Sequence, residues 1–225
     1  MYAILGATGQ VGRAVVASLA ADGHAARMRL IGRTPSADAP AGAAWHHADL
    51  RDGPAALAAA LEGAEAAFVL NPVPVDAGDV HADAAALAGV IAQAVAAARC
   101  PRVVALSGQG AHLDAGTGIV LTLSALEAAL AAGGARTTFV RATSFMQNRV
   151  PIARAALASG TWHAMFAPDL PLPAVSVQVG QLTLNATAVS SAFSRRVSTS
   201  RPRSQFSSAR VLASLRVMVV VPLEV

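Results

Sequence analysis

The sequence predicts an α/β fold, a doubly wound parallel sheet with a small, incomplete lobe at its C-terminal end. Strand-like apolar runs alternate with helical patterns six times over the first 141 residues, as in parallel sheets covered by helices. A cluster of glycines, residues 6–12, follows the first apolar run and opens the first helical pattern. The length of 225 residues suits one large domain with a small appendage.

The predicted elements follow one another in a regular order. Short apolar runs predict six strands, at residues 2–5, 27–31, 43–47, 66–70, 102–106 and 137–141. Apolar residues at helical spacing predict helices from about residue 10 to Asp22-Gly23 and at residues 54–61, 78–99, 117–132 and 145–159. Pro54 suits a first helical turn, whereas Pro151 predicts a break or restart.

The composition changes along the chain. We expect a dinucleotide-binding domain at residues 1–150, the remnant of a substrate lobe at 151–184, and an irregular basic tail at 185–225. The tail holds six arginines, many serines and one acid, Glu224, so the net charge of +4 belongs to the tail. The simpler interpretation is a disordered tail. The alternative is a frameshift in a GC-rich gene. The apolar finish, residues 217–221, suits an edge strand, or is simply an adhesive apolar segment.

Charge and composition exclude several classes of protein. The slightly acidic body gives no reason to expect a nucleic-acid partner. Cys100 is the one cysteine, which excludes a disulfide framework and fits a reducing, cytoplasmic location. No secretory signal precedes the glycines, and the longest apolar stretch, 84–98, is too short for a membrane span. His46 and His47 point to opposite faces of a strand, so no metal site is expected.

The glycine cluster predicts a nucleotide-binding turn. Gly6, Gly9 and Gly12 are spaced GxxGxxG, directly after a strand and at the start of a helix. This arrangement directs backbone N–H groups and a helix N-terminus at a phosphate. Gly6 allows the sharp turn, Gly9 lets a diphosphate approach the backbone, and Gly12 lets the helix lie close to the sheet. We expect cofactor contacts from Gly6, Thr8, Gly9, Gln10, Val11 and Gly12.

Arg33 predicts which dinucleotide is bound. A site for NAD usually carries a carboxylate at the end of the second strand, where it binds the ribose 2′-hydroxyl. Here the sequence reads Gly32-Arg33-Thr34-Pro35, with no acid before Asp38. A guanidinium suits a 2′-phosphate, so we expect NADP as the cofactor, with NAD as the alternative. A solvated loop arginine is the structural alternative.

Further candidates follow later strands, at the edge where ligands bind in such sheets. Asp49 and Leu50 would lie beside an adenine ring, although Asp49 equally suits a helix N-terminus. Asn71 follows the fourth strand and is a cofactor-binding candidate. Ser107 ends the fifth strand, where its hydroxyl would orient a carbonyl oxygen or the nicotinamide amide, and it is the one catalytic candidate. Capping of the next segment is the alternative for Ser107. Arg13 is a further phosphate candidate, with a solvated helix face as the alternative.

Four segments are distinctive when taken together: residues 6–13, Asp49-Leu50, Leu106-Ser107 and residues 141–148. They resemble the NmrA-like family, an atypical branch of the extended short-chain dehydrogenase/reductases, over about residues 1–180. The resemblance implies a Rossmann domain that binds NAD(P), a small C-terminal substrate lobe, and substrate contacts from Phe145 and Asn148. Members include NAD(P)H-dependent quinone and azo-dye reductases and redox-sensing regulators.

The chain also departs from this family. Tyr2 is the one tyrosine and lysine is absent, so the Tyr-x-x-x-Lys pair of typical short-chain dehydrogenases is missing. Leu123 stands where NmrA-like proteins often carry a lysine, and Ala142 replaces a proline. One residue is missing near Val179, and the resemblance ends soon afterwards, which favours the frameshift interpretation.

These observations predict an NADPH-dependent oxidoreductase. Hydride would pass to a quinone-like or other electron-poor small molecule that takes its proton from water, so the missing acid is not needed. Two alternatives stay open. One is a non-catalytic, dinucleotide-sensing regulator with a protein partner, which the loss of the lysine at Leu123 favours. The other is a degenerate, frameshifted member that binds cofactor weakly.

Overall fold

The computed structural model describes residues 1–73, 76–160 and 173–177 and the backbone of residues 219–222. The chain divides into two compact units, which are described separately. The first consists of residues 1–141 with the segment that begins at Val219, and the second begins at Ala142.

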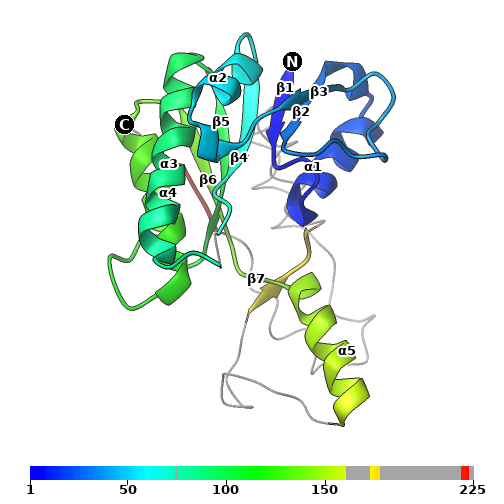
Figure 1. The fold of residues 1–225 in the computed structure, drawn as a ribbon, viewed down its shortest axis with the longest axis vertical. Helices are drawn as coiled ribbons and strands as arrows, with labels where there is room; N and C mark the ends of the chain where they lie inside the picture. Colours follow the sequence, from blue (N-terminus) through cyan, green and yellow to red (C-terminus); the bar gives the residue numbers. More distant parts are fainter. Residues whose placement is uncertain (74–75, 161–172, 178–218, 223–225) are drawn as a thin grey trace, which may run out of the picture. The chain divides into compact units, whose positions relative to one another are not determined.

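One sheet forms the centre of the first unit (Figure 1). Its strand order is β3-β2-β1-β4-β5-β6-β9. The bounds are β1 Tyr2–Leu5, β2 Met28–Gly32, β3 Ala44–His47, β4 Ala66–Leu70, β5 Val103–Gly108, β6 Thr137–Ala142 and β9 Val219–Pro222. The first six strands are parallel, and β9 runs antiparallel to β6. The chain order reverses at β1, because β2 lies on one side of it and β4 on the other.

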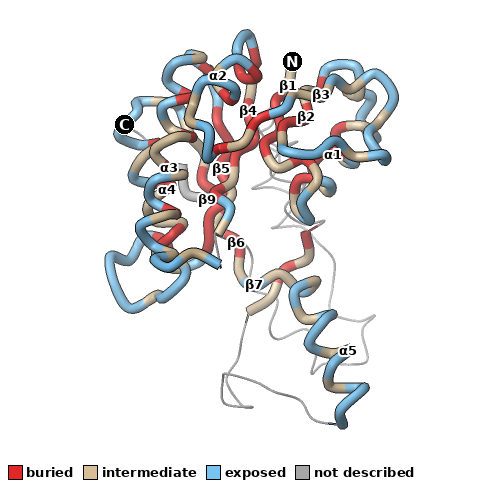
Figure 2. The backbone as a smooth tube through the Cα atoms, in the orientation of Figure 1, coloured by how far each residue is buried: buried red, intermediate tan, exposed pale blue. Residues whose placement is uncertain are grey.

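Helices cover both faces of this sheet. Buried residues of α2 (Ala55–Leu61), α3 (Val80–Ala97) and α4 (Leu121–Ala132) form one core with alternate sheet residues such as Leu5 and Ile31. The other helix, α1 (Gln10–Ala21), buries Val15, Val16 and Leu19 outside that core. Figure 2 shows the buried residues concentrated in the strands. The predicted doubly wound α/β sheet is therefore confirmed.

Helix α3 is apolar and long enough, at 18 residues, to cross a membrane. This differs from the expectation that the apolar stretch 84–98 is too short for a span. The helix passes by length and composition alone, and its residues Ala84, Ala88 and Ile91 are fully buried. The side chain of Asp79 begins the helix by accepting hydrogen bonds from the backbone N–H groups of His81 and Ala82, at 3.0 and 2.9 Å.

The second unit contains two short strands and a helix. Strand β7 (Ser144–Phe145) pairs in parallel with β8 (Ala174–Val175), and a 3₁₀ turn, Met146–Asn148, leads into α5 (Arg149–Ser159). The Gln147 side chain links the turn to the β8 segment, because its Nε2 donates to Ser176 Oγ at 3.1 Å and its Oε1 accepts from the Val177 N–H at 3.3 Å. No residue of α5 is buried.

Three local predictions need correction or completion. The helix predicted from Phe145 begins only at Arg149, because the chain first forms β7 and the 3₁₀ turn. Of the break or restart predicted at Pro151, the structure shows a restart: α5 begins after the 3₁₀ turn, and Pro151 lies in its first turn, where a missing N–H costs no helical hydrogen bond. The apolar finish of the chain forms an edge strand, β9, as one predicted alternative had it.

Candidate functional site

The glycine turn connects β1 to α1 at the reversal point of the sheet. Gly6 has a φ of +70°, a left-handed conformation that side chains other than glycine adopt rarely. The N–H groups of Gly6 and Ala7 both donate to the Ile31 carbonyl oxygen, at 2.9 and 3.3 Å, which fixes the turn to the end of β2. The Gly9 N–H then donates to the Gly6 carbonyl oxygen at 2.9 Å. The turn is thus held by its own backbone.

Gly12 and Gly9 show why this turn requires glycine. A Cβ built on Gly12 would lie 2.1 Å from the Gly6 carbonyl oxygen, a backbone atom that cannot move aside. A Cβ on Gly9 would lie 3.2 Å from the same oxygen, which is tight but not impossible. Helix α1 therefore packs directly on the turn at Gly12. Gly9 is exposed on the outside of the turn, where a diphosphate would approach.

The N-terminus of α1 has no capping side chain. Gly9 occupies the N-cap position with an extended backbone, at φ −75° and ψ 169°, and has no side chain with which to bond the first helical N–H groups. Gly9 and Gln10 are both exposed. A helix N-terminus of this kind favours a negatively charged ligand. The residues present therefore fit the diphosphate of a dinucleotide.

Arg33 follows β2 directly and is exposed. Within the described residues its guanidinium makes no hydrogen bond or ion pair, so the charge is available to a ligand. Arg13 is also exposed, one turn into α1. Both cations lie on segments that follow the carboxyl ends of strands at the reversal point, where the turn also lies.

Asp49 and Leu50 have structural tasks in this chain. The Asp49 carboxylate caps the 3₁₀ turn Leu50–Asp52 by accepting a hydrogen bond from the Arg51 N–H at 3.0 Å. The side chain of Leu50 is buried in the core formed with α2 and α3. The contact of this pair with an adenine ring stays a prediction.

Asn71 lies just beyond β4 and is 5% exposed. Its Nδ2 donates to the Ala84 carbonyl oxygen at 3.0 Å and to the Thr122 carbonyl oxygen at 3.1 Å. The amide group therefore joins the end of β4 to the N-terminal halves of α3 and α4. Its Oδ1 is buried without a hydrogen-bond partner in the described chain. A cofactor contact by Asn71 remains a prediction.

Ser107 belongs to a buried network that the sequence did not reveal. Its hydroxyl donates to Glu127 Oε1 at 2.5 Å. Arg141 bonds the same carboxylate twice, with Nε to Oε1 at 2.9 Å and Nη2 to Oε2 at 2.6 Å. This hydrogen bond with Glu127 raises the pKa of Arg141. The network joins β5, α4 and β6, and it commits the Ser107 hydrogen to Glu127. The signal for it was an acid on an otherwise apolar helix and an arginine in an apolar strand.

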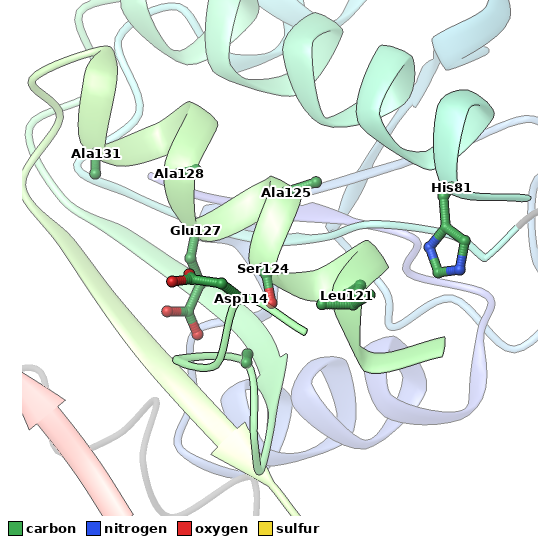
Figure 3. A pocket seen from close by; sticks show the side chains of 9 residues that line it. His81, Asp114, Leu121, Ser124, Ala125, Glu127, Ala128 and Ala131 are labelled. Atoms are coloured by element: carbon green, nitrogen blue, oxygen red, sulfur yellow. The ribbon is translucent and has the colours of Figure 1, made fainter. Parts of the chain in front are cut away.

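A groove of about 610 Å³ runs along α4 (Figure 3). Ser124 and Leu121 lie on the side of the helix that faces the groove, and Asp114 comes from the segment after β5. None of the predicted site residues lines the groove. Glu127 lines it and also bonds Ser107. The complete lining is His81, Ala111, Asp114, Leu121, Ser124, Ala125, Glu127, Ala128 and Ala131.

The remaining predicted residues lie elsewhere. Leu123, at the position of the family lysine, is half-buried on α4. Phe145 lies in β7 and Asn148 ends the 3₁₀ turn, so both belong to the second unit. Among the residues that the structure describes, no three His, Cys, Asp or Glu side chains gather to hold a metal ion.

Comparison with solved structures identifies the fold. An NADPH-dependent quinone oxidoreductase from Escherichia coli, solved with NADPH, is 30% identical, with a TM-score of 0.62. The match covers 71% of this chain and 55% of that one. A triphenylmethane reductase from a Citrobacter species is 19% identical, with a TM-score of 0.69, over 83% of this chain and 64% of its own. A mutant NmrA is 23% identical, with a TM-score of 0.65, over 83% of this chain and 61% of its own. The last two matches show the fold alone.

This chain spans about 55 to 65% of the length of these solved proteins. A search of curated proteins found no match. The family model for the NmrA-like family matches residues 2–211, a range that extends past the last segment in which the sequence motifs were recognisable. Since that range covers nearly all of the sequence, the chain belongs to the NmrA-like family of NAD(P)-binding proteins.

Proposed function

We propose that this protein binds NADP(H) and transfers hydride from it to a quinone-like or other electron-poor small molecule. The observation that carries this proposal is the glycine turn at the reversal point of the sheet, with Gly12 packed against the Gly6 carbonyl. Further support comes from the 30% identical quinone oxidoreductase, which was solved with NADPH. A reducing cytoplasm is the proposed compartment, because Cys100 is a free, buried thiol.

The chain's own residues would divide the binding between them. The N-terminus of α1, which has no capping side chain, would hold the diphosphate, because a helix N-terminus favours negative charge. Gly9 would contribute by having no side chain, which lets the diphosphate approach the turn where Gly9 is exposed. Arg33 would bind the 2′-phosphate, because its guanidinium is exposed and unpaired in the described chain. NADP would thereby be preferred to NAD.

The bound dinucleotide supplies the hydride. The acceptor takes its proton from water, so no lysine or tyrosine acid is required. The hydrogen bond of Ser107 agrees with water as the proton source. Its hydroxyl hydrogen is donated to Glu127 and is therefore not offered to a substrate carbonyl. Phe145 and Asn148 are the proposed acceptor contacts, from the family resemblance. An acceptor that already stabilises added charge, such as a quinone, needs no donor from the protein.

The test is oxidation of NADPH with menadione as acceptor, measured for the full chain and for the Gly9→Val variant. The added side chain should exclude the diphosphate, so the variant should lose turnover. The proposal predicts turnover by the unaltered chain well above that of NADPH and menadione without protein. A rate no better than the protein-free rate removes the reductase proposal.

A regulatory protein that senses the dinucleotide is the second candidate. Leu123 favours it, since an apolar side chain stands where a lysine would donate to the cofactor. Cofactor-dependent capture of a protein partner, together with no menadione turnover, would support the regulator. Turnover without any cofactor-dependent partner would support the reductase.

A further inference from the structure

His47 lies beside the end of β2 because of the register between β2 and β3. Gly32 and His47 are paired in this parallel ladder, and they are the last residues of their strands. The Ala48 N–H donates to the Gly32 carbonyl oxygen at 3.1 Å, which extends the pairing by one bond. Arg33 follows Gly32 directly. Figure 1 shows β2 and β3 side by side, so His47 and Arg33 occupy neighbouring strand ends.

The two adjacent histidines occupy opposite faces of β3. The Trp45 ring lies where a Cβ on Gly32 would point, at 3.2 Å, so Trp45 and Gly32 share one face. His47 is two residues further along and lies on that same face, whereas His46 lies on the other. His46 is paired with Ile31, which is fully buried. His47 is exposed.

The nearby acids do not pair with Arg33 or His47 in the described part of the chain. Asp49, two residues after His47, uses its carboxylate to cap the following 3₁₀ turn. Asp38 lies in the loop after Arg33, where its backbone N–H is held by Ser36 Oγ at 3.2 Å. Within the described part of the chain, neither Arg33 nor His47 forms an ion pair.

We propose that His47 is a second residue that recognises the 2′-phosphate of NADP(H), together with Arg33. This inference rests on the proposed function, since it assumes that the adenosine end of the dinucleotide lies at the ends of β2 and β3. A phosphate presents three acceptor oxygens, and a bidentate guanidinium contact uses two of them. The imidazole of His47 would donate to the third.

The experiment separates the 2′-phosphate from the rest of the cofactor. Adenosine 2′,5′-bisphosphate and adenosine 5′-monophosphate differ only in this group, and calorimetry measures the affinity of the full chain for each. His47→Ala should weaken bisphosphate binding about three- to tenfold and leave monophosphate binding unchanged. His46→Ala is the matched control and should leave the ratio of the two affinities unchanged. His47→Arg should restore the preference for the bisphosphate.

Each outcome supports or overturns the inference. Equal weakening of both ligands by His47→Ala, or the same loss of preference in His46→Ala, would overturn it. So would an unchanged ratio in His47→Ala while the unaltered chain still prefers the bisphosphate, and in that case the proposed function survives. Failure of the unaltered chain to bind NADPH at all removes both. His47→Gln, which keeps the size of the side chain, replaces His47→Ala if that variant does not fold.

Discussion

Arg141 holds Glu127 by two hydrogen bonds, from Nε to Oε1 at 2.9 Å and from Nη2 to Oε2 at 2.6 Å. Their side chains are only 18% and 10% exposed, so this is an ion pair largely removed from water. Because Ser107 donates to the same carboxylate, the pair fixes the end of β5 against α4 and β6. Ser107, Glu127 and Arg141 thus link β5, α4 and β6 near the carboxyl ends of the strands. The glycine turn of the candidate site also follows the carboxyl end of a strand, β1.

We predict that Glu127→Ala destabilises the protein by about 3 kcal/mol, because it leaves a nearly buried guanidinium unpaired. Replacing both partners, Glu127→Leu with Arg141→Met, should cost much less, since no buried charge is then left alone. The free energy of unfolding in urea measures both. A double variant as unstable as the single one would mean that the lost packing, and not the unpaired charge, causes the effect.

Gly12→Ala should disrupt the glycine turn. Its Cβ would lie 2.1 Å from the Gly6 carbonyl oxygen, so α1 must move away from the turn. We expect a loss of about 1–3 kcal/mol of stability and at least about a tenfold loss of NADPH affinity. Gly89→Ala is the matched control, because Gly89 lies within α3 with open space around its Cβ position.

The control should stabilise the protein by about 0.5–1 kcal/mol through the higher helix propensity of alanine and leave NADPH binding intact. Calorimetry with NADPH and urea unfolding distinguish the two variants. If Gly12→Ala bound NADPH as tightly as the unaltered chain, close packing of α1 on the turn would not matter for the cofactor.

The sequence was sufficient to predict the sheet because its signals are local. Each strand is a short apolar run, and the GxxGxxG spacing identifies the turn between β1 and α1. The start of α5 was predicted four residues early, since Phe145 and Met146 fit a helical pattern equally well. Only pairing with β8, some 30 residues later, draws Phe145 into a strand.

The polar network could not be predicted for a different reason. Glu127 and Arg141 stand out as charged residues in apolar elements, but the sequence does not show that they meet each other and Ser107. Only the strand order brings the three together. Asn71 shows the same limit, because its partners belong to helices 13 and 51 residues away. Long-range hydrogen bonds leave no periodic pattern, whereas backbone turns and apolar faces do.

Arg33→Glu should separate the two cofactors. The change replaces an exposed cation by an anion at the end of β2 and should weaken NADPH binding about tenfold to a hundredfold, the value of one charge-assisted contact of about 1.5–3 kcal/mol. NADH binding should change little. Arg102→Glu makes the same charge change just before the amino end of β5, whereas Arg33 follows the carboxyl end of β2. This control variant should bind both cofactors as the unaltered chain does. Equal losses of NADPH and NADH affinity in Arg33→Glu would refute the role assigned to Arg33.

Glu65, which directly precedes β4, should make the stability of the whole protein depend on pH. Hydrogen bonds from the Met1 amino group and from Arg27 hold the pKa of its carboxyl at about 2, and the Arg27 contacts are 2.8 and 2.9 Å long. In the unfolded chain the pKa returns to 4.5. Because the folded pKa is the lower one, the ionised carboxylate stabilises the fold fully above the unfolded value, and this contribution is lost as the pH falls toward 2.

The comparison of interest is between the unaltered chain and Glu65→Gln, by urea unfolding across this pH range. The difference in stability should be constant near neutral pH, shrink below the unfolded pKa and disappear near pH 2. It should also shrink in salt, because all three groups are exposed and screened. Glu62→Gln, an exposed glutamate at the end of α2, should show no such trend. A difference that persisted unchanged down to pH 2 would show that Glu65 acts through packing and not through its charge.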